Sequence, residues 1–543
     1  MERADDKTNE NFGLPQCADE YIAAVVKKMR GGRSARRSVR SELTAHFEDE
    51  LKDLRTPPQR EEKARRLIES FGEAKLLGVL CRRAKKRCRP LWQKVLVRGA
   101  LVLGLLFSYL VLCTLPLILG RPTIRVNYVQ WLSERWRPQT GEAENARVYY
   151  DKAVELYVKP SQGLEGKMTA PGWKARDCNE AEQALLSAWL AQNGPAFDML
   201  RRGAGVQRYW PIYDASRPDP ADPNFLEDSF REFAGYRRVV FALRDWIAYV
   251  AERGRVDEAL DDCLVIQRFS RHLQAKGFLM EQLVGIAIEA LGTGRLRDVL
   301  GRYGVPLPVL ERIQRRMMLD FDAHRRVIDL EGEKVLWYDR IQRTFTDDGE
   351  GGGHALGGGM PYAAGNWTRN LLGILAFDYP DRRETVAMVE RYFQEAQEAF
   401  DRPPNGNGPS PSDARAKMPA ESLLMGLTAP VYERVVQQVW RVKTGEAATL
   451  AVVAILRYKG EKGHYPADLA EVVEAGLLPN VPQDPFGAGA LTYRKTADGF
   501  LLYSWGENGK DDGGRLGTTS DGRPRMWANN GDWVFWPVER DGS

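Results

Sequence analysis

The stretch GALVLGLLFSYLVLCTLPLILG, residues 99–120, decides how the rest of the chain is organised. Its 22 residues include no charged side chain. A helix rises about 1.5 Å per residue, so a segment of this length can cross the roughly 30 Å hydrocarbon layer of a membrane. Because the backbone finds no water to bond inside that layer, the segment has to be helical. We therefore predict one membrane-spanning helix over residues 96–120.

Positive charge is concentrated on the N-terminal side of this segment. Residues 82–98 contain eight lysines and arginines and no acidic residue, whereas residues 120–140 contain four arginines and one glutamate. Lysine and arginine resist translocation, so we expect the N-terminus in the cytoplasm and the C-terminus in the periplasm or outside. This predicts a single-pass protein of a bacterial cytoplasmic membrane. Topology and anionic lipid account for the basic run, so we predict no nucleic-acid partner.

Composition sets broad limits. The chain has 543 residues, of which 43% are hydrophobic, and this allows several domains with cores of their own. Its net charge of +4 favours no acidic partner. Six cysteines are too few for a disulfide framework. Only Cys178 and Cys263 are predicted outside the cell membrane, and whether they pair stays open.

The cytoplasmic part, residues 18–95, follows a polar start over residues 1–17 that we expect to be disordered. Apolar residues at helical spacing predict short helices over four segments, which are 18–29, 38–54, 61–71 and 73–87. The segments SELTAHFEDEL and EEKARRLIESFGEAKLL resemble the small helical prefix domains that precede membrane segments in bacterial regulators and permeases. The resemblance implies a cytoplasmic interaction module. A helical collar that only seats the membrane anchor is the alternative.

Residues 121–401 are predicted to be helical. The clearest unit spans residues 233–273, where two amphipathic helices flank a tight turn at Gly254. This turn resembles that of a tetratricopeptide helix pair, and residues 146–157 suggest a second unit. A degenerate tetratricopeptide region and an irregular helical bundle therefore remain equal alternatives. Three segments are predicted as loops: the proline-rich 211–224, the glycine-rich and flexible 347–361, and the linker 402–418.

The C-terminal region, residues 419–543, combines a long helix with short strands. We predict the long helix over residues 428–458 and a short one over 468–475. The Asp-Gly pair at 498–499 is a hairpin signal between strands at 491–494 and 499–504. A third strand is predicted at 532–537.

Three motifs in this region stand in a recognisable order. Gly-His-Tyr-Pro at 463–466 comes first, Asp-Pro-Phe-Gly at 484–487 follows, and Tyr-Ser-Trp-Gly at 503–506 ends the second strand. The order resembles the globular domain of the major pseudopilins of type II secretion. The resemblance covers about 95 residues and implies the same α+β fold. The chain lacks the family's leader and apolar N-terminal helix, so we do not expect it to polymerise as a pilus subunit.

Calcium is the cofactor that this resemblance implies. In the family, acidic groups of the last loop hold the ion, and Asn508, Asp511, Asp512 and Asp532 are the residues here that could do so. Calcium prefers six to eight oxygen ligands in irregular loops. Asn508 stands where the family usually has aspartate, and a solvated polar loop is the alternative. From the residues themselves, Asp484 is expected to close a turn by bonding the backbone beyond Pro485.

No catalytic motif is evident in the sequence. The five histidines are scattered, and we predict no small-molecule substrate. Glu331 and Glu333, with His324 and Asp329 nearby on a helical stretch, are the best carboxylate cluster, although a charge-rich helix face is the simpler and preferred explanation. The pairs at 237–238 and 325–326 are arginines that we expect on the surface.

We thus predict a multidomain, mainly α-helical chain. It comprises a cytoplasmic helical domain, one transmembrane helix, an exported α-helical hairpin domain and a C-terminal α+β pseudopilin-like domain. The favoured hypothesis is a non-enzymatic membrane-anchored protein whose exported domains bind proteins or assemble at the envelope. A transmembrane sensor with a cytoplasmic output module is the second hypothesis. An exported hydrolase with an unrecognised site is the third.

Overall fold

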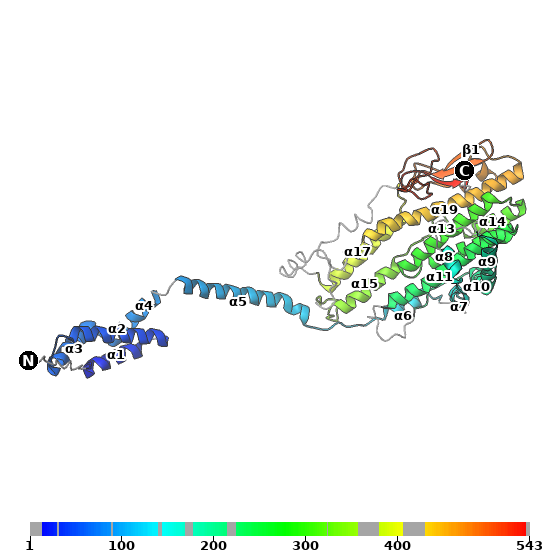
Figure 1. The fold of residues 1–543 in the computed structure, drawn as a ribbon. Helices are drawn as coiled ribbons and strands as arrows, with labels where there is room; N and C mark the ends of the chain where they lie inside the picture. Colours follow the sequence, from blue (N-terminus) through cyan, green and yellow to red (C-terminus); the bar gives the residue numbers. More distant parts are fainter. Residues whose placement is uncertain are drawn as a thin grey trace, which may run out of the picture. The chain divides into compact units, whose positions relative to one another are not determined.

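The computed structural model of the protein describes residues 13–29, 32–87, 91–138, 144–168, 178–213, 224–322, 324–356, 380–405 and 429–538. The chain is mainly helical with one small sheet, as predicted (Figure 1). It divides into two compact units, residues 1–112 and 113–543. Most of the predicted disordered start, the loop 211–224 and the linker 402–418 lie outside the described residues.

Besides the start of the long apolar helix described next, the first unit has four short helices, as the sequence predicts. They are α1 (Gln16–Lys28), α2 (Arg33–Leu51), α3 (Pro57–Phe71) and α4 (Ala74–Arg87). Helix α3 begins with proline at its first position, where the missing N–H costs nothing, and it ends at Gly72, whose φ is +74°. A small core of Ile22, Phe47 and Leu51, all fully buried, holds these helices together.

Helix α5 (Leu91–Ile118) contains the predicted span. Its stretch Val95–Leu115 has 21 residues and a mean hydropathy of 2.3, which makes it long and apolar enough to cross a membrane. Almost all of its apolar side chains are exposed, with Cys113 at 5% as the exception; Leu103 and Phe107, for example, are both 67% exposed. A helix of this composition needs an apolar environment, and a membrane supplies one.

The second unit is built mostly of helices, which include the predicted hairpin. Helices α11 (Asn224–Glu252) and α12 (Val256–Leu273) flank a turn in which Gly254 has a φ of +80°. The second repeat-like segment, suggested by the sequence at residues 146–157, forms helix α7 (Ala146–Leu156). This helix packs mainly against α10 (Gly194–Gly205). The other helices among the described residues of this part are α6 (Tyr128–Trp136), α8 (Gln162–Met168), α9 (Glu180–Gln192), α13 (Leu279–Arg302), α14 (Leu307–Asp320), α15 (Glu331–Thr344) and α17 (Arg382–Asp401).

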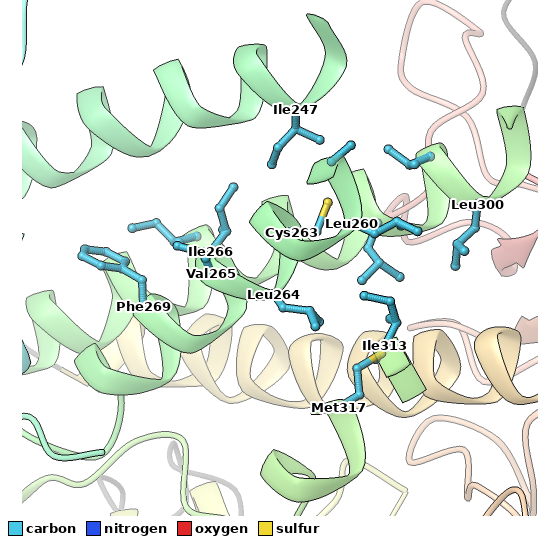
Figure 2. Packing of buried hydrophobic residues seen from close by; sticks show 14 of the residues in the cluster. Ile247, Leu260, Cys263, Leu264, Val265, Ile266, Phe269, Leu300, Ile313 and Met317 are labelled. Carbon is cyan, nitrogen blue, oxygen red and sulfur yellow. The ribbon is translucent and has the colours of Figure 1, made fainter. Parts of the chain in front are cut away.

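Helix α12 lies at the centre of the core. Figure 2 shows its apolar side chains, among them Leu260 and Phe269, surrounded by residues of neighbouring helices. Helix α13 approaches α12 closely because it has glycines at the contact: a Cβ on Gly292 would lie 2.9 Å from Ile266, and one on Gly285 would lie 2.8 Å from the Ser270 carbonyl oxygen. Helices α11, α13 and α19 (Ala429–Lys462) run side by side (Figure 1).

The C-terminal region has the predicted helices and strands. Helix α19 continues four residues beyond the predicted end and stops before Gly463, whose φ is +81°. A short helix, α20 (Leu469–Glu474), precedes strands β1 (Thr492–Lys495), β2 (Phe500–Ser504) and β3 (Trp533–Trp536). They form an antiparallel sheet in the order β1-β2-β3.

The sheet and the helices share one hydrophobic core. Residues of α12, α14, α19 and β3, including Leu260, Ile313, Val453 and Phe535, belong to the same buried cluster. The structure therefore groups the helical part and the C-terminal region in one unit. The finer domain boundaries predicted at 401 and 419 stay predictions.

Candidate functional site

Two C-terminal motifs meet at the carboxylate of Asp484, which is 2% exposed. Its Oδ1 accepts hydrogen bonds from the Phe486 backbone N–H at 3.1 Å and from Ser504 Oγ at 2.7 Å. Its Oδ2 accepts one from the Trp505 backbone N–H at 2.9 Å. The bond to Phe486 confirms the turn predicted over Pro485. The other two explain why Asp-Pro-Phe-Gly and Tyr-Ser-Trp-Gly occur together: one carboxylate joins them.

The four residues predicted to bind calcium lie near one another beside β2 and β3. Asp532 is fully buried and accepts hydrogen bonds from the backbone N–H groups of Asp512 at 3.3 Å and Gly514 at 2.6 Å. Asn508 Nδ2 donates to Asp512 Oδ2 at 2.8 Å. Asp511 Oδ1 accepts from the Gly513 backbone N–H at 2.9 Å. The structure therefore brings all four residues into one loop cluster.

Hydrogen-bond donors already occupy much of this cluster. The bonds from Gly513 and the Tyr503 hydroxyl lower the pKa of Asp511, whereas burial raises the pKa of Asp532. In the part of the chain that the structure describes, no group of three or more acidic, histidine or cysteine side chains is arranged to hold a metal ion. Calcium would have to replace N–H donors at these oxygens, and its binding stays a prediction.

The predicted carboxylate cluster at 324–333 does not form one site. The sequence predicts a helical stretch here, but helix α15 begins only at Glu331. His324 and Asp329 therefore lie in the preceding loop. Glu333 accepts a hydrogen bond from the Leu279 backbone N–H at 3.0 Å, and burial raises its pKa. Glu331 instead pairs with Arg135 at 3.3 Å. The two glutamates thus have different partners and do not face a common site.

Glu331 and Asp329 line an open pocket of about 670 Å³ between α6, α15 and α17. Five acidic and three basic side chains line it. Several of these charges pair with each other, for example Arg326 with Asp401 at 3.1 Å. The pocket therefore has mixed charge, part of which is paired within the protein.

A buried ion-pair network is the most distinctive polar feature of the second unit, and the sequence prediction missed it. Arg325, expected on the surface, has only 13% of its side chain exposed. Its Nη2 lies 2.7 Å from Glu289 Oε1 and 2.8 Å from Glu446 Oε2. Arg271 also pairs with Glu446, and Gln274 bonds both Arg325 and Glu289. This buried network joins α12, α13 and α19 to the loop before α15.

The charges of this buried network balance. It holds two arginines, Arg271 and Arg325, against two glutamates, Glu289 and Glu446, whose side chains are 1% and 3% exposed. Burial raises the pKa of Glu289, while Arg325 acts in the opposite direction. A paired carboxylate held in this way fixes helices to each other. Arg326, by contrast, is 48% exposed and lies at the surface as predicted.

The described histidines stay apart from one another. His272 is 7% exposed, its Nδ1 lies 2.6 Å from the Tyr150 hydroxyl, and its ring stacks on Tyr209. Burial lowers the pKa of His272 to about 3, so the ring is neutral. The cysteines Cys178 and Cys263 are both free, which settles that they do not pair.

The segment that follows α5 is tied to the glycine-rich loop. His354 Nε2 lies 2.8 Å from the Leu119 carbonyl oxygen, and Arg125 pairs at 3.0 Å with Asp347, whose side chain is 3% exposed. Gln342 accepts from the Val126 backbone N–H and donates to its carbonyl. The described part of the loop, up to residue 356, is thus a hydrogen-bonded turn, and its flexibility stays a prediction.

Comparison with known proteins gives no match. No family model fits the chain, and no curated protein or solved structure is similar to it at a significant level. The resemblances to prefix domains, tetratricopeptide pairs and pseudopilins therefore stay predictions.

Proposed function

We propose that this protein is a single-pass, non-enzymatic membrane protein whose helical and pseudopilin-like parts bind other proteins at a bacterial envelope. The observation that carries the proposal is helix α5, whose 21-residue stretch Val95–Leu115 is apolar enough to cross a membrane and has almost all of its side chains exposed. Its relation to secretion rests on analogy with the pseudopilin motif order alone.

The connection between α5 and residues beyond it supports an anchoring role. Leu119, Arg125 and Val126 each contact the segment 342–354 through a hydrogen bond or an ion pair. The segment that follows α5 is therefore held against the second unit. Such an attachment suits a body that is presented at a membrane surface.

The buried titratable groups fit a structural role. Asp262 pairs with Arg201 at 2.8 Å, and Glu289 pairs with Arg325 at 2.7 Å. Catalytic carboxylates usually face a cleft with a perturbed pKa and room for substrate. These two are engaged by arginines inside the protein instead.

Charge substitution in α5 tests the anchoring part. The double variant Leu106→Arg/Phe107→Arg places two charges in the apolar helix, each of which costs about 2.5–3.5 kcal/mol at a membrane centre. We expect the variant to leave the membrane fraction or to be degraded. Leu185→Arg, at a side chain that is 55% exposed outside α5, is the matched control and should stay in the membrane. A double variant that remains membrane-bound would refute the anchor.

Site-specific photocrosslinking tests the binding part. A photoreactive residue at Leu185 or at Leu319, which is 81% exposed, would be introduced in the full chain in intact cells. We expect a discrete crosslinked species from at least one position. The same species should form when the chain also carries Glu331→Gln/Glu333→Gln, because the proposed binding does not depend on these carboxylates. Absence of any crosslink from the exposed positions, or turnover of a substrate by the purified chain, would overturn the proposal.

A further inference from the structure

A pocket of about 880 Å³ lies between helix α13 and the C-terminal sheet. This volume is in the range of small-molecule sites, which are typically about 300–1,000 Å³. Its lining is mostly apolar, and its two charged residues are both arginines, Arg297 and Arg515. The apolar side chains that line it are Leu501, Leu516, Pro524, Met526, Val534, Phe535, Pro537 and Val538.

Arg297 is the buried charged residue in the lining of this pocket. It lies on α13, is 4% exposed, and has no acidic side chain within ion-pair distance among the residues described. The other buried arginines differ, since Arg325 and Arg271 each pair with a glutamate. Burial lowers the pKa of Arg297 to about 10, so its guanidinium still carries a charge at neutral pH.

The hydrogen bonds of Arg297 leave one edge of the guanidinium open. Nη1 donates to the Gly445 carbonyl at 3.3 Å and to the Thr449 hydroxyl. Among the described residues, the acceptor at Nη2 is the sulfur of Met526, at 3.9 Å, and Met526 itself lines the pocket. A guanidinium carries five N–H donors in a planar fork, and its Nε–Nη2 edge fits the two oxygens of a carboxylate.

We propose that this pocket binds an organic carboxylate with an apolar body. Arg297 receives the carboxylate on its open Nε–Nη2 edge, and Phe535, Leu516 and Val534 cover the apolar part. Phe535 already packs near the guanidinium, whose carbon lies 5.4 Å from the centre of the ring. Arg515, which is exposed at the same pocket, adds positive charge at the rim. A bound carboxylate thus supplies the counter-charge that the described residues do not supply.

The test uses the full chain in lipid nanodiscs and a pair of probes. The first probe is 3-phenylpropionate, and the second is its neutral amide, which has the same shape and no charge. Isothermal titration calorimetry, corrected with empty nanodiscs, measures binding of each. We expect the acid to bind at least tenfold more tightly than the amide, because a buried charge-assisted pair is lost with the amide.

Two variants separate a binding role of Arg297 from a structural one. Arg297→Met keeps the volume and removes the charge, and it should weaken binding of the acid at least tenfold without lowering the thermal midpoint of the unliganded chain. Arg295→Met, on the same helix, removes an ion pair with Asp298 and should leave binding unchanged. A lower midpoint for Arg297→Met with unchanged binding would show a structural role and overturn the proposal.

A chain ending at Val538 distinguishes an external ligand from the protein's own acidic end. The residues removed include Glu539 and Asp541. Equal binding by the full and shortened chains supports an external carboxylate. Binding by the shortened chain alone would mean that the protein's own carboxylates occupy the pocket. This result would overturn the proposal of an external ligand. Equal affinity for acid and amide, or no binding by either chain up to about 10 mM, also overturns the proposal.

Discussion

Replacing Arg325 with methionine should be among the most destabilising single changes in the second unit. The side chain of Arg325 is 13% exposed and bonds two carboxylates that are almost fully buried, Glu289 and Glu446. The variant leaves Glu446 with Arg271 as its remaining partner, and Glu289 with only the amide of Gln274. One buried negative charge therefore loses its counter-charge.

The expected loss follows from this count. Removing one partner of a buried ion pair typically costs about 3–5 kcal/mol of unfolding free energy. In a unit of this size, that corresponds to a fall in the thermal midpoint of about 3–5 °C. Burial already raises the pKa of Glu289, and loss of Arg325 raises it further. Because a protonated carboxyl needs no counter-charge, the difference from wild type should shrink as pH falls from 8 towards 5.

Urea unfolding followed by tryptophan fluorescence measures this effect. Of the 14 tryptophans, only Trp92 lies outside residues 113–543, so the signal reports on the second unit. Arg326→Met is the matched control: its side chain is 48% exposed, and the change should cost less than about 1 kcal/mol. Equal losses for the two variants, or a loss at Arg325 that grows as pH falls, would refute the reasoning.

Four further predictions concern other parts of the second unit. Asp484→Ala should lower the unfolding free energy by about 3 kcal/mol, because three donors lose their buried acceptor; a urea midpoint like that of wild type would contradict this. His272 has a pKa of about 3, below its unfolded value, so protonation of the unfolded chain should remove about 2 kcal/mol of stability between pH 7 and 5. His272→Phe should flatten that dependence, and an unchanged slope would count against it. Calcium at about 100 times Kd should raise stability by roughly 2.7 kcal/mol in the full chain but not in Asp511→Ala; no shift in either would leave a metal-free loop. Isolated residues 429–543 should show little protection from hydrogen exchange, since α19 loses the core it shares with α12 and α14; a protected fragment would show that this region folds alone.

Local signals predicted most of the helices and strands. The turn at Gly254 needs a positive φ, and the Asp-Gly pair at 498–499 matches the β1–β2 hairpin. Both depend on neighbours in sequence, so the pattern alone locates them. The apolar helix α5 is predictable for a similar reason, because its length and composition suffice.

Burial of particular charges was not predictable from local pattern. Arg325 and Arg326 are adjacent and chemically alike, yet only Arg325 is buried. Its partners Glu289 and Glu446 lie 36 and 121 residues away in sequence, so no local pattern reveals them. The spacing of Glu331 and Glu333 itself argues against a shared site. Residues two apart on a helix point about 200° from each other, so these carboxylates cannot share one face.

The three C-terminal motifs at 463–466, 484–487 and 503–506 specify a local loop structure, but helix α19, which precedes them, packs into the core of the whole second unit. At Gly445 and Glu446, helix α19 meets both polar features of this unit: Arg297 donates to the Gly445 carbonyl, and Glu446 pairs with Arg325 in the buried network. One turn of α19 therefore connects the proposed carboxylate pocket to the network that fixes α12 and α13. An organic anion at Arg297 acts on the same turn that positions Glu446. A ligand in this pocket thus has a direct structural route to the packing of the helical body, which an independent module attached by a linker would not provide.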